Sequence, residues 1–145
     1  MLSMEKLNFN QMLQAAVDAV KEESKTAQLY QAFTGKKMNV MQVIFKGDLK
    51  YPSYVVLVDS LGDTTVKGMP SPYMEDLVIK LPLEMTQEES EAALVAAGYN
   101  QKWNSITLRA PLYKVVYPPL YIYEVEHVGF IAVDSTDATN VFPLS

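Results

Sequence analysis

The chain has 145 residues, of which 49% are hydrophobic and 20% charged, a composition typical of one soluble globular domain and not of a disordered chain. It has no cysteine, which excludes disulfides, thiolate zinc sites and a cysteine nucleophile. No apolar run approaches the roughly 20 residues of a membrane-spanning helix, and residues 1–6 lack the basic start and apolar stretch of a signal peptide. We therefore expect a cytoplasmic protein that does not enter a membrane.

The net charge of −5 is unevenly distributed along the chain. Up to Pro70 there are eight lysines against seven acids, and beyond it four basic residues against ten acids. Nucleic-acid binding needs clustered cations that displace counterions from phosphate, and only Lys36 and Lys37 come close to such a cluster. The charge pattern thus excludes a nucleic-acid partner and indicates a solvated acidic surface in the second half.

The first element in chain order is a predicted helix with a capping box, in which Asn8 is the N-cap and Gln11 the reciprocal residue. Apolar residues then recur at helical spacing, at Phe9, Met12, Leu13, Ala16, Val17 and Val20, and less regularly at Ala27, Leu29, Tyr30 and Phe33. Gly35 is the predicted stop. The pattern predicts a helix of about seven turns that covers a sheet.

Runs rich in β-branched and aromatic residues next predict strands at 40–45, 54–58 and 64–66, with turns between them. Residues 68–72 have the densest turn chemistry in the chain and form the predicted boundary between two halves. Residues 73–81 alternate well enough for another strand, with Asp76 and Lys80 on the side opposite the apolar residues.

A second, shorter helix is predicted from the capping box of Thr86 and Glu89 to the stop at Gly98. The remaining residues predict an antiparallel meander, with strands at 106–108, 113–116, 120–125, 130–133 and 140–142. The turns that would connect the last of these strands are residues 127–129 and 136–138.

Two stretches of the chain resemble each other. One runs from Lys37-Met38-Asn39 to a Tyr-Pro step at Tyr51 and an apolar strand, and the other from Lys102-Trp103-Asn104 to a Tyr-Pro step at Tyr117 and an apolar strand. The pattern predicts an α+β fold of two tandem related units, residues 1–70 and 71–145, each with a helix packed on an antiparallel β-sheet.

The second unit resembles the PepSY domain. The segments that carry the resemblance are TQEESEAA at 86–93, YIYEVE at 121–126 and FIAVDSTD at 130–137, which together span roughly the last 60 residues. The resemblance implies a cystatin-like helix packed on a curved antiparallel sheet, and a non-catalytic role that is often peptidase-associated or inhibitory. The tandem arrangement is also similar, in architecture alone, to proteins of the β-lactamase-inhibitor type.

No motif predicts catalysis, a metal or a cofactor. His127 is the only histidine, and a catalytic interpretation would pair it with Glu124, Glu126 or Asp134 and with Ser60 or Ser135 as nucleophile. No Gly-x-Ser-x-Gly motif surrounds either serine, and one histidine with scattered carboxylates does not specify a metal site. Nucleotide-binding glycine motifs are absent as well. We expect no catalytic residue, no metal and no cofactor.

Tyrosines of the second half are the candidate interaction surface: Tyr113, Tyr117, Tyr121 and Tyr123. Tyr121 and Tyr123 would share one face of a strand, and tyrosine is common among the residues that anchor interfaces. Packing inside the molecule is the alternative, because tyrosine is often a partly buried core residue.

Three functions are compatible with these features. The first is a non-enzymatic module that binds a protein or peptide through the sheet face or an edge strand, as an inhibitor or regulator. The second is a small-ligand-binding protein or an enzyme with a pocket between helix and sheet near His127. The third is a structural subunit of a larger assembly.

Overall fold

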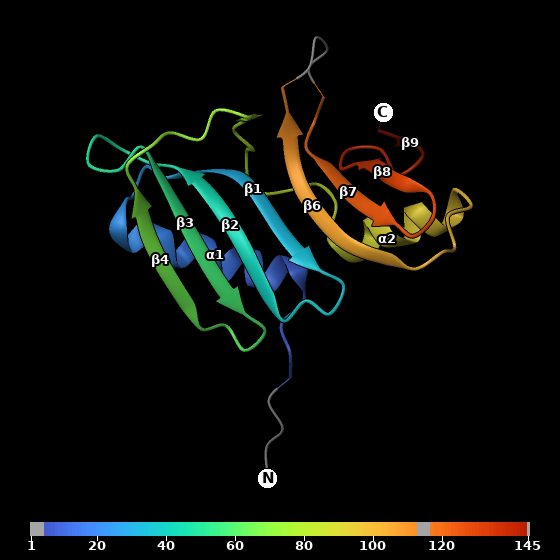
Figure 1. The fold of residues 1–145 in the computed structure, drawn as a ribbon, viewed down its shortest axis with the longest axis horizontal. Helices are drawn as coiled ribbons and strands as arrows, with labels where there is room; N and C mark the ends of the chain where they lie inside the picture. The colour runs from blue at the N-terminus through green and yellow to red at the C-terminus, as the bar shows by residue number, and fades with distance from the viewer. Residues whose placement is uncertain (1–4, 113–116, 145) are drawn as a thin grey trace.

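A computed structural model describes residues 5–112 and 117–144, which form one antiparallel sheet of nine strands with two helices against the same face (Figure 1). Eight strands lie in the order β4-β3-β2-β1-β6-β7-β8-β9, and the short strand β5 pairs with the end of β6. The elements are α1 (Phe9–Glu23), β1 (Gln28–Gly35), β2 (Val40–Lys46), β3 (Ser53–Asp59), β4 (Thr64–Met69), β5 (Asp76–Leu77), α2 (Gln87–Ala96), β6 (Trp103–Pro111), β7 (Leu120–Val125), β8 (Gly129–Asp134) and β9 (Val141–Pro143).

Both predicted capping boxes are confirmed. The Asn8 side chain accepts the Gln11 N–H and the Gln11 side chain accepts the Asn8 N–H, each at 2.9 Å. Thr86 and Glu89 make the same reciprocal pair at the start of α2. Gly98, at φ +101°, follows the last turn of α2, a conformation that glycine adopts without the steric cost of a Cβ.

The predicted length of the first helix is wrong. Helix α1 ends at Glu23 after 15 residues, and the segment up to Gly35 is strand β1. Residues 21–26 are all polar. A helix continued through them would have no apolar side chain to pack on the sheet for almost two turns. Beyond them, aromatic and β-branched residues favour a strand in which Leu29, Ala32 and Thr34 are buried. Gly35 therefore ends a strand.

The remaining predictions of regular structure are largely confirmed. The segments 40–45, 54–58, 64–66, 106–108, 120–125, 130–133 and 140–142 fall on β2, β3, β4, β6, β7, β8 and β9 respectively. The predicted strand at 113–116 lies outside the described residues.

The segment 70–86, here called the linker, differs from its prediction. Only Asp76 and Leu77 form a strand, and Ile79 makes one bridge to Leu29 on β1. The linker lies between the diverging ends of β1 and β6, because β5 pairs with β6 on one side and Ile79 with β1 on the other. In this position Asp76 is buried, whereas the alternation of polar and apolar residues predicts it on an exposed side.

Strand register fixes which side chains share a face of the sheet. The face toward the helices, the helix face, contains a buried row of directly paired residues: Val56, Val43, Ala32, Leu108, Tyr121 and Val133. The opposite face, the open face, contains the row Thr65, Leu57, Gln42, Phe33, Thr107, Ile122, Ala132 and Phe142. A single core therefore occupies the helix face and extends under all the long strands.

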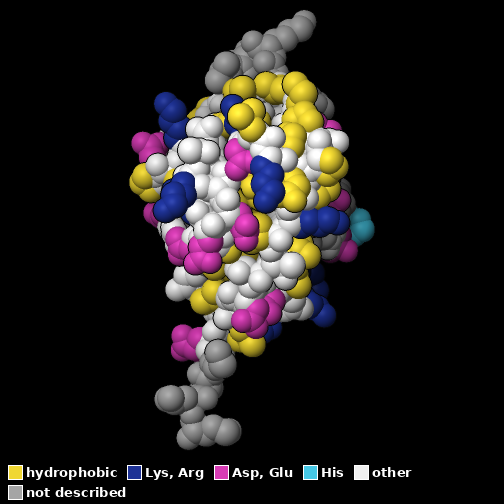
Figure 2. Space-filling model, turned by 90° about the vertical axis from the view of Figure 1, so that its left-hand side faces the viewer, with side chains coloured by type: hydrophobic (Ala, Val, Ile, Leu, Met, Phe, Trp, Pro, Cys, Tyr) yellow, Lys and Arg dark blue, Asp and Glu magenta, His cyan; other side chains and the backbone are white. Residues whose placement is uncertain are grey.

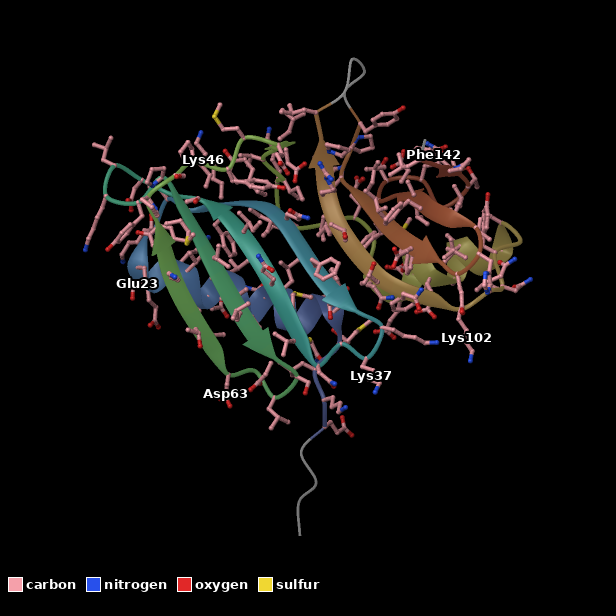
Figure 3. The ribbon with its side chains drawn as sticks, viewed as in Figure 1. Glu23, Lys37, Lys46, Asp63, Lys102 and Phe142 are labelled. Carbon is pink, nitrogen blue, oxygen red and sulfur yellow. The ribbon has the colours of Figure 1, made fainter. Side chains whose placement is uncertain are left out.

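The two resembling stretches of sequence do not occupy equivalent strands. The first leads through β2 to β3 and the second through β6 to β7, although Lys37 and Lys102 lie at the same end of the sheet (Figure 3). In the strand order, β6 is at the centre beside β1, whereas β2 is one strand away from the centre. A symmetric comparison of the halves would match β1, not β2, with β6.

Gly47 offers a test of the loop between β2 and β3. A Cβ at this position would overlap the main-chain oxygen of Tyr51, because the Gly47 N–H donates to Pro52 O across a tight loop. We expect Gly47→Ala to lower the free energy of unfolding by about 1–3 kcal/mol in urea denaturation. Gly35→Ala is the control, since its nearest neighbouring atom would be 3.8 Å away. Equal stability of the two variants would contradict the described loop.

Candidate functional site

Tyr121 and Tyr123, two of the four predicted surface tyrosines, are core residues. Both project from β7 onto the helix face and have no exposed surface. Leu120 and Ile122 project to the other face, so the predicted alternation along this strand is confirmed. The reason that the tyrosines are not at the surface is that α2 and the start of α1 cover this part of the helix face.

The hydroxyls of these tyrosines hold the two helix N-termini together. The Tyr121 hydroxyl donates to Met85 O at 2.6 Å and accepts from Asn10 Nδ2 at 3.3 Å. The Tyr123 hydroxyl lies 2.5 Å from Ser90 Oγ and 3.2 Å from Gln87 O. Asn10 of α1 also accepts the Gln87 N–H at the first turn of α2, at 2.8 Å. The hydroxyls are therefore used inside the molecule.

Burial raises the pKa of Tyr121 to about 12 and also raises that of Tyr123, because a phenolate there would be removed from water. Both phenols therefore stay protonated near neutral pH. Of the other two predicted residues, Tyr117 is partly exposed and stacks on Phe142 at 5.7 Å between ring centroids, and Tyr113 lies outside the described residues.

The open face carries the exposed apolar residues that the tyrosine prediction missed. Phe33 at its centre is 42% exposed, Leu57 on β3 45% and Phe130 on β8 50%. Over β7 and β8, Tyr117, Phe142 and Leu144 cover a small second cluster of Leu120, Ile122 and Ala132. On the side of the molecule that β4 borders, lysines and acids alternate, and hydrophobic side chains gather toward the top of the view (Figure 2).

A hollow of 300 Å³ lies on the open face where the two halves of the sheet meet. Gln31 of β1 and Thr107 and Arg109 of β6 line one side of it, and Ile122, Phe130 and Leu144 line the other. The hollow is thus bounded by hydrogen-bonding groups on one side and apolar groups on the other, which is the usual composition of a site that holds a side chain or small ligand.

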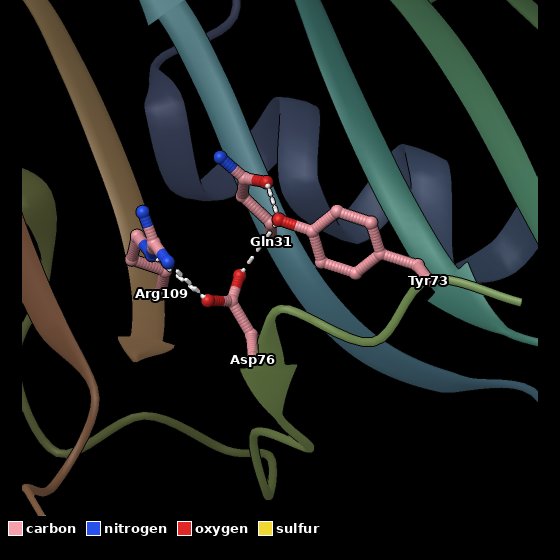
Figure 4. Close-up of polar contacts among 4 residues, drawn as sticks. All are labelled: Gln31, Tyr73, Asp76 and Arg109. Carbon is pink, nitrogen blue, oxygen red and sulfur yellow. Dashed lines mark hydrogen bonds and ion pairs between the residues drawn. The ribbon is translucent and has the colours of Figure 1, made fainter. Parts of the chain in front are cut away.

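A four-residue polar network borders this hollow (Figure 4). Arg109 donates from Nε and Nη2 to Asp76 Oδ1 at 2.9 and 2.6 Å. The Tyr73 hydroxyl lies 3.1 Å from Asp76 Oδ2 and 2.7 Å from Gln31 Oε1. Gln31 and Arg109 are directly paired across β1 and β6. The network therefore fastens the linker to both central strands.

Asp76 is the most confined charge of this network, because its side chain has no exposed surface while that of Arg109 is 31% exposed. Burial raises the pKa of the Asp76 carboxyl above its ordinary value, and Arg109 and Tyr73 act in the opposite direction. Removal of Arg109 would leave a buried carboxylate with the uncharged Tyr73 hydroxyl as its hydrogen-bond partner.

His127 lies far from any such arrangement. It occupies the turn between β7 and β8 at φ +65°, its side chain is 87% exposed, and its Nε2 lies 3.7 Å from the carboxylate of the adjacent Glu126. It does not line the hollow on the open face. Ser135 is buried beyond β8, and Ser60 follows β3, where its N–H donates to Asn39 O. The structure does not bring these residues together.

Across residues 5–112 and 117–144, no three histidine or acidic side chains converge as metal ligands would. Neither of the two helices in this part of the chain has the length and apolarity needed to cross a lipid bilayer.

Sequence reasoning missed the open-face site because Phe33 was assigned to a helix and Arg109 lay outside the predicted strand at 106–108. Alternation around Gln31 and Phe33 is the signal that indicates their shared face. The pairing of Arg109 with Asp76 joins residues that are distant in sequence and has no local signal.

Arg109→Gln tests the network. Loss of the guanidinium leaves the Asp76 charge buried without its cation, and we expect the free energy of unfolding at neutral pH to fall by about 3 kcal/mol. The deficit should shrink as the pH is lowered, because the pKa of Asp76 is raised above its ordinary value of 3.8 and the buried carboxyl becomes neutral before a free aspartate would. Urea denaturation at several pH values measures this.

The double variant Arg109→Gln, Asp76→Asn is the control for the same experiment. It removes the uncompensated charge and should recover most of the lost stability at neutral pH. A deficit in Arg109→Gln that did not change with pH would contradict the role of the buried carboxylate.

No family model matches the chain, and no curated protein matches it either. The resemblance to the PepSY domain therefore stays a prediction. The fold is similar to that of a "putative lipoprotein" from Clostridium difficile 630, whose crystal structure matches 97% of this chain and 94% of that chain at a TM-score of 0.61 and 14% sequence identity. The likeness supports the fold alone: an α+β protein in which helices pack on an antiparallel sheet.

Proposed function

We propose that this protein is a non-enzymatic binding module whose open face receives an extended segment of a partner protein. The observation that carries the proposal is the exposure of Phe33, at the centre of a continuous row that crosses strands of both halves. Such a module acts by binding its partner and not by a chemical reaction, as an inhibitor or regulator does.

The composition of the open face supports a protein partner. Phe33 and Leu57 are large apolar side chains that binding would remove from water. Gln42, which pairs directly with both residues, supplies an amide for hydrogen bonds. Interfaces of this kind combine a few apolar anchors with adaptable polar groups around them. The adjoining hollow of 300 Å³ has room for one anchoring side chain of the partner between Thr107 and Phe130.

We also infer that the two halves are related units, each with one helix followed by four strands of the main sheet. Support comes from the repeated order of elements, the two capping boxes and the symmetric strand order about the β1–β6 pair. A superposition of residues 9–69 on 87–143 tests this inference. A match of β1 with β6 would support it, and a better match of β2 with β6 would contradict this pairing of the strands.

The cytoplasmic location expected from the sequence stays a prediction, and the binding proposal does not depend on it.

Phe33→Arg tests the binding proposal. An arginine at this exposed position places an unpaired charge in the centre of the face. We therefore expect the dissociation constant for a captured partner to rise at least about tenfold. A photo-crosslinking residue at position 57 should label that same partner. Binding is measured by surface plasmon resonance after the captured protein has been identified and purified.

Leu49→Arg is the matched control, because Leu49 is fully exposed in the loop between β2 and β3 and does not belong to the open face. It should bind like the parent protein, and both variants should keep the parental unfolding midpoint. A partner whose affinity for Phe33→Arg equals that for the parent protein would overturn the proposed face.

A further inference from the structure

A groove separates α1 from the linker, on the side of the molecule opposite to the open face. It consists of two hollows, of 470 and 310 Å³, that share three lining residues: Val17, Lys21 and Leu81. The larger follows α1 from Asn10 to Lys21, and the smaller continues toward Phe45. The eleven helical steps from Asn10 to Lys21 correspond to a length of about 16 Å. The groove is therefore long and narrow, and both hollows lie in the volume range of ligand sites.

The lining of the groove is apolar along its length. Leu13, Val17, Leu81, Leu83 and Met85 contribute side chains to the larger hollow. Leu81 is 42% exposed and forms part of the boundary between the two hollows. A ligand that covered these side chains would remove apolar surface from water, which is the main source of free energy for binding in such a groove.

All charged side chains that line the groove are positive. Lys21 lines both hollows and Lys80 the smaller one, and neither makes a salt bridge with another described residue. The nearby acids Asp18 and Glu84 do not line either hollow. In a protein with a net charge of −5, this local excess of cations at the junction of the hollows favours a ligand with one negative charge.

The uncharged polar side chains of the larger hollow already make hydrogen bonds within the protein. Asn10 bonds Gln87 and Tyr121, Gln14 donates to Asp18 at 2.9 Å, and Thr86 caps α2. A peptide in this groove would find few free partners for its main-chain N–H and C=O groups, and an unpaired buried group is costly. A hydrocarbon chain makes no such demand.

We propose that the groove between α1 and the linker binds an amphiphile with a single acyl chain and an anionic head group. The acyl chain lies along Leu13, Val17 and Leu83, and the head group lies at the junction of the hollows beside Lys21 and Lys80. This site is separate from the open face, so it does not depend on the binding of a protein partner there.

Calorimetric titration with dodecanoate, below its critical micelle concentration, tests the proposal. Dodecanol and dodecyltrimethylammonium have the same chain with a neutral and a cationic head, and both should bind at least tenfold more weakly. Equal affinity for the three compounds would overturn the role of the lysines. No detectable binding of dodecanoate would overturn the site itself.

Two variants locate the bound ligand. Gln14→Trp places a bulky ring in the groove from an exposed helix position, and Lys21→Glu reverses the charge at the junction. Each should reduce dodecanoate affinity at least tenfold while the unfolding midpoint stays close to the parental value. Lys37→Glu, at the far end of the sheet in the turn between β1 and β2, is the control and should bind normally. Parental affinity in both groove variants would place the ligand elsewhere and overturn the proposal.

Discussion

The hydroxyl groups of Tyr121 and Tyr123 impose the constraint on which the rest of the fold depends. Each is fully buried, and a buried hydroxyl is tolerated only where it is hydrogen-bonded. The partners are Met85 O, Asn10, Gln87 and Ser90, which belong to the linker, to α1 and to α2. The hydrogen bonds that these two hydroxyls of β7 require therefore position both helices and the end of the linker at once. Every buried side-chain polar atom among the described residues has a partner, so this junction is specified without an unpaired group.

Placement of both helices on one face divides the sheet into two surfaces with different roles. The helix face contains the continuous core and accounts for most of the apolar burial. On the other face, Tyr117, Phe142 and Leu144 cover Leu120, Ile122 and Ala132 of the second half and leave Phe130 exposed, whereas Phe33 and Leu57 of the first half are both exposed. Exposed large apolar side chains on the same face of a sheet are unfavourable in water unless something covers them. Our proposal of a protein partner gives this asymmetry a physical reason.

Local signals in the sequence predicted the parts of the fold that are determined locally. The capping boxes at Asn8 and Thr86 and the alternation along β7 are such signals, and the structure confirms them. The end of α1 was mispredicted because apolar residues of β1 continued the helical pattern less regularly beyond a polar stretch. Burial of Tyr123 and the pairing of Asp76 with Arg109 depend on contacts between distant residues, so no local pattern distinguishes a surface tyrosine from a core one or an exposed acid from a buried one.

The position of the linker between β1 and β6 has a consequence for the order of folding. Gln31 and Arg109 pair directly although they belong to opposite halves of the chain, and the sheet can close on both sides of Asp76 only after the linker is in place. Contacts between such distant residues carry a large entropic cost of loop closure and form slowly. We therefore expect the hairpins of each half to form first and the central seam last. Once closed, that seam joins the strands of both halves into one continuous hydrogen-bonded sheet.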